Sequence, residues 1–203
     1  MVNSTQNIYS GIREIKREAL EENVPIMQDA TIDFITDYIG KKRIKKILEI
    51  GTATGYSAIM MALSDPEVTI TTIEKDKDRY IKALKNIKKM DLEKRITLIF
   101  NDALEVKLKE KFDLIIIDAA KSKNLDFFKN FEKNLEITGS IITDNLNFHG
   151  YVKQDLEKIA SKNIRGLVKK IRLYIDFLDN NLKYKTKFYD LGDGISVTER
   201  RLK

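Results

Sequence analysis

Short apolar runs alternate with amphipathic segments of helical length along most of this chain of 203 residues. The runs are strand-length and rich in Ile, and they lie at 44–50, 68–73, 96–100, 112–117 and 140–143. Between them, apolar residues recur at helical spacing over 56–63, 77–89, 125–135 and 151–161. Strands separated by helices form parallel sheets that are covered on both faces. The alternation therefore predicts an α/β, doubly wound fold with a mostly parallel sheet.

The two ends of the chain depart from this alternation. Near the N-terminus, helical spacing over 8–20 and over 26–39, the latter closed by Gly40, predicts a helical extension before the sheet. After a last helix at 168–178, strand-like segments at 186–191 and 195–198 flank a Gly-Asp-Gly turn, which predicts a C-terminal antiparallel hairpin. No repeat or linker divides the chain. We therefore expect a single domain over 1–203, with N-terminal helices in 1–40 and the core in 41–203.

Residue types that the chain lacks remove several classes of protein. It has no cysteine, which excludes disulfide scaffolds, thiol nucleophiles and thiolate metal sites. No uninterrupted apolar run approaches 18 residues, and the first residues lack the apolar region of a signal peptide. We therefore expect a cytoplasmic protein with no membrane partner.

The formal net charge of +6 is concentrated in the last quarter of the chain. Residues 1–149 carry 24 basic and 24 acidic side chains, whereas 150–203 carry 13 basic and 7 acidic ones. Clustered Lys and Arg can form a surface for a polyanion such as RNA. A solvated helix face in a Lys-rich protein has the same composition, so the charge leaves both interpretations open.

In open α/β sheets, ligands bind beyond the carboxyl ends of the strands, so the polar residues that follow the predicted strands are informative. The first strand leads into Glu49-Ile-Gly-Thr-Ala-Thr-Gly-Tyr-Ser57, where two glycines permit a tight turn before a helix N-terminus. Glu74 ends the second strand, 23 residues after Gly51, the spacing of an acid that binds ribose hydroxyls. The glycine loop and Glu74 together favour a nucleotide cofactor. The alternative is that Glu74 is only an acidic residue before the N-terminus of the next helix. Asp102-Ala103, after the third strand, could frame a base or cap a helix.

The fourth and fifth strands also end in polar residues. Asp118 and Lys121 follow the fourth, and Asp144 and Asn145 follow the fifth. Carboxylate and amide oxygens are the ligands that Mg²⁺ prefers, and an ionised Asp118 after an apolar run needs a partner or a cation. Lys121 could pair with that carboxylate or act as a base. A surface salt bridge and a turn are the alternatives, but the two pairs together favour a metal site.

His149 is the only histidine of the chain and follows Asn145 by four residues. It could line the mouth of the site, or it could be structural. A single histidine does not supply a zinc site, and no Gly-x-Ser-x-Gly motif supports a serine hydrolase.

In order and spacing, these residues resemble the metal-dependent class I S-adenosylmethionine (SAM) O-methyltransferases of the catechol and caffeoyl-CoA type. The resemblance covers about residues 24–199, and its Asp-x-x-Lys and Asp-Asn pairs distinguish this branch from other Rossmann-like methyltransferases. Pro25-Ile26-Met27, the closing Gly192–Ile195 and the short length are most similar to the bacterial enzymes that methylate 5-hydroxyuridine at the tRNA wobble position to 5-methoxyuridine.

The resemblance implies a role for each matching residue. The residues around SAM would be Met27, Gly51, Ser57, Glu74, Asp102, Ala103 and Asp118. The ligands of Mg²⁺ or Mn²⁺ would be Asp118, Asp144 and Asn145, and the catalytic residues would be Asp118 and Lys121, with Lys121 as the base. The chain departs from the family at Ser122-Lys123 and at His149, and both departures concern the acceptor, not the cofactor.

Three functions remain open on the sequence. They are a tRNA wobble-uridine O-methyltransferase, a catechol-type methyltransferase of small molecules, and a Rossmann-like RNA- or nucleotide-binding domain without catalysis. The convergent metal set argues against the third. The basic C-terminal quarter, with Lys169, Lys170 and Arg172 as its expected contacts, favours the tRNA anticodon loop as partner. The resemblance also implies a homodimer, with the N-terminal helices as plausible interface.

Overall fold

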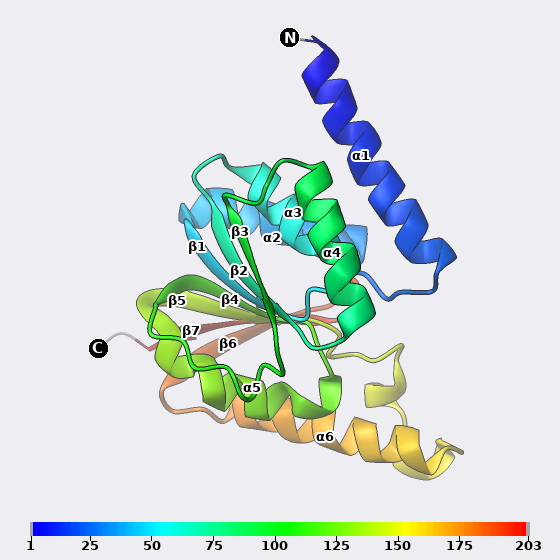
Figure 1. The fold of residues 1–203 in the computed structure, drawn as a ribbon. Coiled ribbons are helices and arrows are strands. Elements are labelled where there is room, and N and C mark those ends of the chain that lie inside the picture. The colour runs from blue at the N-terminus through cyan, green and yellow to red at the C-terminus, as the bar shows by residue number, and fades with distance from the viewer. Residues whose placement is uncertain (1, 202–203) are drawn as a thin grey trace. The chain divides into compact units, whose positions relative to one another are not determined.

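The computed structural model describes residues 2–201 of the chain (Figure 1). Within them the backbone forms two compact units, residues 2–106 and 107–201, and each is described by itself. The single domain expected over 1–203 includes residues 1, 202 and 203, which lie outside the described residues. No observation tests that expectation, and it stays a prediction.

The first unit begins with a pair of helices and continues with three parallel strands in the order β3-β2-β1, with a further helix after each of the first two strands. Its helices are α1 (Val2–Glu21), α2 (Asp29–Lys42), α3 (Tyr56–Ser64) and α4 (Lys77–Lys89). Its strands are β1 (Lys46–Ile50), β2 (Thr69–Glu74) and β3 (Ile96–Phe100). The apolar strand residues that defined the sequence pattern, such as Ile47 and Leu48, are fully buried. The predicted alternation of strands and helices is therefore present in this unit.

A capping residue explains where α4 begins, and helix packing with an ion pair holds α1. Asp76 caps α4, because its carboxylate accepts a hydrogen bond from the backbone N–H of Arg79 at 2.9 Å. Helix α1 packs on α3. An ion pair of 2.5 Å joins Lys16 of α1 to Asp29, the first residue of α2. The N-terminal helical extension is thus attached to the rest of its unit.

The second unit contains four strands in the order β4-β5-β7-β6. The strands are β4 (Phe112–Ile117), β5 (Leu135–Thr143), β6 (Tyr184–Tyr189) and β7 (Ile195–Arg200). The α-helices are α5 (Asn124–Phe131) and α6 (Lys162–Asp179), and the 3-10 turns are η1 (Lys121–Lys123), η2 (Glu132–Asn134), η3 (Tyr151–Lys153) and η4 (Leu156–Lys158). β4 and β5 are parallel, whereas β7 is antiparallel to both β5 and β6. The predicted C-terminal hairpin is confirmed.

Aromatic rings form the core between the helices and the hairpin of the second unit. Phe128 of α5 meets Tyr174 and Phe177 of α6 and Tyr184 of β6, with ring centroids between 5.2 and 6.3 Å apart and edges directed at faces. Edge-to-face contacts of this kind add to the apolar burial. They explain why α5 and α6 lie side by side in this unit (Figure 1).

The seven strands, mostly parallel and ending in an antiparallel hairpin, confirm the predicted α/β, Rossmann-like fold with an N-terminal helical extension. Among the residues that the structure describes, no helix is both long and apolar enough to cross a membrane.

Several helix ends differ from the prediction. Helix α1 begins at Val2 instead of residue 8, and α6 begins at Lys162, after the cap Ser161, instead of residue 168. Helix α2 does not stop at Gly40 but continues to Lys42, and Arg43 ends it with a left-handed φ of 54°. The backbone N–H groups of Arg43 and Ile44 donate to the carbonyls of Gly40 and Ile39, and the side chain of Ile44 is buried directly after the helix. Helix α5 ends at Phe131, before the predicted position 135. There, Asn134 donates to the carbonyls of Leu108 and Glu110, and the chain enters β5 at Leu135.

The predicted helix at 151–161 is wrong. The segment forms η3 and η4, and four of its carbonyl groups accept hydrogen bonds from arginine side chains of α6. Arg172 binds the carbonyls of Val152 and Gln154, and Arg165 binds those of Ile159 and Ala160. A carbonyl in an α-helix is satisfied by the N–H four residues later. Here contacts with the arginine side chains of α6 replace those local bonds.

Candidate active site

The loop between β1 and α3 adopts the tight turn that its glycines predicted. Gly51 has a φ of 100°, Ala53 of 49° and Gly55 of 83°, so three of five residues are left-handed. Such values are easy for glycine and strained for other residues. A Cβ on Gly55 would also lie 3.4 Å from the side chain of Ala83 on α4. The turn therefore places the backbone close to the N-terminus of α3.

Glu74 at the end of β2 holds this loop from the side. Its carboxylate accepts backbone N–H bonds from Ala53 at 2.8 Å, Lys75 at 2.9 Å and Asp76 at 2.8 Å. An ionised carboxylate can accept about four hydrogen bonds. These three fix the orientation of the nearly buried side chain and leave it capacity for one more donor, such as a ribose hydroxyl.

A second buried carboxylate lies beneath the loop. Glu49 of β1 is fully buried and accepts hydrogen bonds from the hydroxyls of Ser57 and Thr72, each at 2.5 Å. The hydroxyl of Thr72 also contacts that of Thr52 at 2.6 Å. Neither Glu49 nor Thr72 was among the predicted site residues. The sequence did contain a signal for Glu49, because a charged residue inside an apolar strand must be paired or hydrogen-bonded.

The remaining cofactor residues predicted in the first unit lie in two segments, one before α2 and one after β3. Met27 is buried in the extended segment before α2, and Ala103 is buried after β3. Asp102 accepts a hydrogen bond from the N–H of Leu104 at 3.0 Å and lies 3.5 Å from the ammonium of Lys75. The segment after β3 is joined to the end of β2, because Asn101 N–H donates to the carbonyl of Glu74 at 3.0 Å.

The second unit brings Asp118, Asp144 and Asn145 together, as the sequence predicted. Neighbouring parallel strands β4 and β5 pair Ile117 with Thr143, so the two acids follow directly at one edge of the sheet. The side-chain amide of Asn145 donates to Asp118 at 3.0 Å, and its backbone N–H donates to Asp144 at 2.7 Å. Asn145 is left-handed, with a φ of 65°, which directs its side chain back across the strand ends.

The electrostatics of this pair are unfavourable without a counter-charge. Burial raises the pKa of Asp118 to about 6, and the positive charge of Lys121 opposes that shift. Burial and the repulsion from Asp118 together raise the pKa of Asp144 to about 7. Two carboxylates in one buried site cannot both ionise easily. A cation placed between them would relieve both penalties.

The residues fit a hard divalent cation such as Mg²⁺. Such ions take oxygen ligands and use only a few protein groups, keeping several waters. No cluster of three or more His, Cys, Asp or Glu suited to a metal occurs among residues 2–201, because the third donor here is an amide. Asn145 presents its amide nitrogen to Asp118, so it must turn its oxygen toward a cation in order to bind one. Lys121 opens η1 beside the pair.

His149 belongs to a strained turn next to this cluster. Phe148, His149 and Gly150 are all left-handed, with φ of 46°, 53° and 82°. The backbone N–H of His149 donates to the buried carboxylate of Asp193 at 2.6 Å, while its side chain is 70% exposed. The structure therefore leaves the imidazole at the surface, where it can meet an acceptor, and uses the backbone of His149 structurally.

Asp193 is a site residue that the sequence analysis missed. It lies in the turn before β7, is 5% exposed, and its charge contributes to the raised pKa of Asp144. The turn also binds the loop after β5, because the carbonyls of Asp193 and Gly194 accept the N–H groups of Asn147 and Leu146. A Cβ on Gly194 would meet the backbone of Asn147 at 3.0 Å. The Gly-Asp-Gly pattern predicted a turn but not this contact.

Known proteins share both the fold and the sequence pattern. A Staphylococcus aureus protein described as a candidate caffeoyl-CoA O-methyltransferase superposes with a TM-score of 0.89 and 32% identity, covering 99% of this chain and 100% of its own. An O-methyltransferase from Bacillus cereus, solved in complex with S-adenosylhomocysteine (SAH), superposes with a TM-score of 0.81 at 23% identity over 95% and 91% of the two chains. The fold is thus that of Rossmann-like methyltransferases.

The sequence comparisons define the family. The family model described as O-methyltransferase matches residues 3–201. Caffeoyl-CoA O-methyltransferase of Populus kitakamiensis is 27% identical over 175 residues, which are 82% of this chain and 74% of that protein. The chain belongs to the O-methyltransferase family.

Proposed function

We propose that the protein is a SAM-dependent O-methyltransferase that uses a divalent cation and acts on 5-hydroxyuridine at the wobble position of tRNA. Membership of the O-methyltransferase family supports the reaction type. The observation that carries the cation-dependent mechanism is the convergence of Asp118, Asp144 and Asn145 at one edge of the sheet, where Asn145 donates to both acids and Asp144 is buried.

The first unit supports SAM as the methyl donor. SAM supplies a methyl group on a sulfonium, which leaves as SAH when the methyl is transferred, and the Bacillus cereus protein of this fold was solved with SAH. Glu74 would accept from the ribose, and the left-handed loop at Gly51 would allow close backbone approach. Ser57 and Met27 would line the methionine part, and Asp102 and Ala103 the adenine.

The second unit supports an acceptor with two adjacent oxygens. Asp118, Asp144 and Asn145 would hold Mg²⁺ or Mn²⁺, which when bound stabilises negative charge on an acceptor oxygen. Lys121 would take the proton from the acceptor hydroxyl, so that the new carbon–oxygen bond forms as the carbon–sulfur bond breaks. The cluster orients the oxygen for in-line attack. A 5-hydroxyuridine offers its 5-hydroxyl and O4 as such a pair.

A catechol-type acceptor is the second candidate, because catechols offer the same pair of oxygens. The relative from Populus kitakamiensis is named for caffeoyl-CoA, which favours a small molecule. The basic last quarter of the chain favours RNA instead, since a small phenol needs no phosphate contacts. The homodimer and the cytoplasmic location expected from the sequence form part of this proposal.

Nucleoside mass spectrometry of tRNA from a strain without this gene tests the acceptor. We expect 5-methoxyuridine to disappear and 5-hydroxyuridine to accumulate, and the wild-type gene to reverse both changes. An Asp144→Ala gene should fail to do so. Unchanged 5-methoxyuridine in the deletion strain would contradict the tRNA acceptor and leave the small-molecule candidate.

A further inference from the structure

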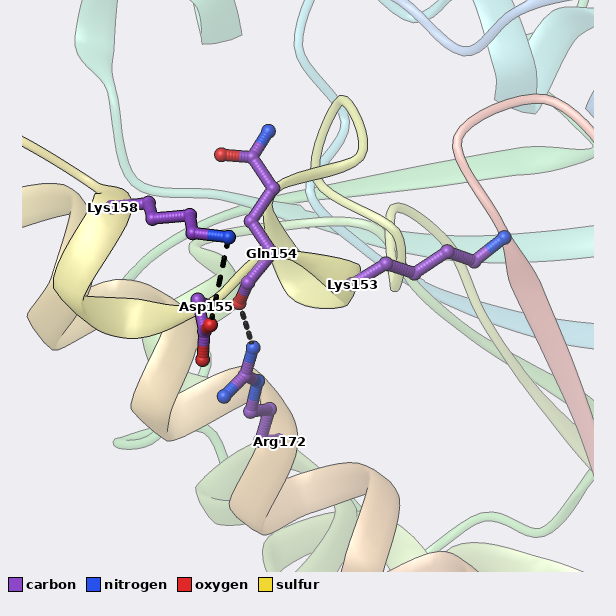
Figure 2. Close-up of a pocket in the computed structure, with 5 residues that line it drawn as sticks. All are labelled: Lys153, Gln154, Asp155, Lys158 and Arg172. Carbon is purple, nitrogen blue, oxygen red and sulfur yellow. Dashed lines mark hydrogen bonds and ion pairs between the residues drawn. The ribbon is translucent and has the colours of Figure 1, made fainter.

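A hollow of about 610 Å³ lies in the second unit between α6 and the η3–η4 segment. Its lining residues are Lys153, Gln154, Asp155, Lys158 and Arg172 (Figure 2). Three of the five are basic and one is acidic, so the hollow has an excess of positive charge. None of them belongs to the proposed SAM or cation sites.

Arg172 is held in place at the wall of this hollow. Its Nε and Nη2 donate to the carbonyl of Val152 at 3.0 and 2.8 Å, and Nη2 also donates to the carbonyl of Gln154. These acceptors are neutral, so they orient the guanidinium without cancelling its charge. A guanidinium has five donor hydrogens, and among the described residues no hydrogen bond uses those on Nη1. Arg172 thus combines a fixed position with free capacity for an anion.

The two lysines of the hollow are held only weakly. Lys158 lies 3.8 Å from Asp155, and Lys153 lies 3.6 Å from Asp190. All four side chains are at least 69% exposed, and ion pairs of this length between exposed groups contribute little. Figure 2 shows Lys158 reaching toward Asp155 and Arg172 bound to the carbonyl of Gln154, while Lys153 extends the other way. Both lysines can therefore turn toward an incoming anion.

We propose that this hollow binds a backbone phosphate of the RNA acceptor, with Arg172 as the fixed donor and Lys153 and Lys158 as mobile ones. The inference rests on the proposed function and adds a contact site to it. A phosphate accepts hydrogen bonds from a guanidinium fork and from ammonium groups.

The surroundings favour a chain of phosphates over a single phosphorylated small molecule. Lys169 is exposed one helical turn before Arg172 and lies on the same side of α6. Positive charge therefore continues along the helix beyond the hollow. An RNA backbone presents phosphates in succession and can use both positions, whereas a small acceptor would occupy one.

The double variant Lys153→Ala/Lys158→Ala tests this site and leaves the Arg172 contacts intact. We expect its KM for a tRNA anticodon stem-loop carrying 5-hydroxyuridine to rise about tenfold, with kcat unchanged, because phosphate contacts contribute affinity without sequence information. The salt dependence of RNA binding should also weaken. The matched control, Lys109→Ala/Lys133→Ala, removes the same charge from exposed positions outside the hollow and should change KM less than twofold.

Two further measurements sharpen the outcome. Asp155→Asn removes the one negative charge of the hollow and should lower the RNA KM. A phosphate-free catechol, used as a minimal acceptor, should show the same KM with every variant. Equal RNA KM values for the double variant and its control would overturn the inference while leaving the tRNA function intact. A raised KM for a CoA thioester but not for RNA would also overturn it. Wild-type protein that methylates no RNA would instead contradict the proposed function itself.

Discussion

The two units of the molecule treat their buried acids in opposite ways. In the first unit, Glu74 accepts three backbone N–H bonds and Glu49 accepts two hydroxyl bonds. In the second, Asp118 and Asp144 both accept hydrogen bonds from the single residue Asn145, and burial raises the pKa of both. Hydrogen bonds to a carboxylate favour its charged form, whereas burial disfavours it.

This difference separates a preformed site from one for which we propose a bound ion. The loop and acids of the first unit hold their geometry through contacts within the protein, so a cofactor can bind without rearranging charge. In the second unit, the proposed cation would favour the charged forms of acids whose pKa values are raised. We therefore expect SAM binding to be independent of metal and methyl transfer to depend on it.

The largest effect should come from Asp144→Ala, which removes a proposed metal ligand. We expect kcat to fall by more than about a hundredfold, because residues that merely orient metal ligands already contribute 10–100-fold. SAM affinity, measured by calorimetry, should stay within about twofold of wild type, since none of the first unit's acids is changed. The control Asp176→Ala removes an exposed acid from α6. An active Asp144→Ala enzyme would contradict the proposed dependence of methyl transfer on a metal ion in the second unit.

Glu74→Gln should produce the converse result. The amide nitrogen cannot accept the N–H bonds that one carboxylate oxygen now receives, and a buried unsatisfied donor costs about 1–3 kcal/mol. We expect the Kd for SAM to rise about tenfold or more while metal binding is unchanged. Glu93→Gln, an exposed acid of the same unit, is the matched control. Equal SAM affinity in both variants would show that Glu74 serves only the turn.

Substitutions at Asp193 should separate its charge from its hydrogen bond. Asp193→Ala leaves the N–H of His149 without its acceptor and should lower the free energy of unfolding by about 1–3 kcal/mol. Asp193→Asn keeps an acceptor oxygen but removes the charge that raises the pKa of Asp144. It should retain stability and move the pH midpoint of metal binding downward. Urea unfolding measures the stability, and Mg²⁺ titration across pH measures the midpoint of metal binding. If both variants behaved identically in both measurements, the separate roles of the hydrogen bond and the charge would be contradicted.

The smallest expected effect is a pH dependence of stability without metal. Asp118 and Asp144 titrate near 3.8 in the unfolded chain but at about 6 and 7 in the folded protein. The folded state therefore keeps protons that the unfolded state has lost, and the stability they confer declines as pH rises from about 4 to about 7. In EDTA, we expect the Tm of wild type to fall over this range by about 5 °C more than that of Asp144→Asn. Parallel curves would contradict the raised pKa values.

Local patterns predicted the fold where local contacts decide it. The helix predicted at 77–89 forms with those bounds, because it combines an Asp76 cap with a clear amphipathic period. The segment 151–161 has similar spacing but folds as 3-10 turns, since Arg165 and Arg172 bind its carbonyls from α6. The Arg172 contacts span 18 and 20 residues of sequence, and helical periodicity does not predict contacts of that kind.

The residues of the candidate site were likewise predictable only where their place next to a strand decides their position. Asp118 and Asp144 were predictable because each directly follows a buried strand, and parallel neighbours end at one edge. Asp193 was not, because it reaches the site from a turn some 50 residues later in the chain. The expectation that Arg172 acts with Lys169 and Lys170 as a plain surface contact also missed its bonds to the η3 segment.

A radiolabel assay tests most directly whether the protein transfers a methyl group from SAM to the 5-hydroxyl of 5-hydroxyuridine in tRNA with the help of a cation. Purified protein is incubated with methyl-labelled SAM and an anticodon stem-loop containing either 5-hydroxyuridine or uridine, in Mg²⁺ or in EDTA. We predict label in the 5-hydroxyuridine RNA with Mg²⁺ and background counts in the other three mixtures. Equal labelling in EDTA would contradict the cation-dependent site, and no labelling of RNA beside rapid labelling of a catechol would contradict the tRNA acceptor.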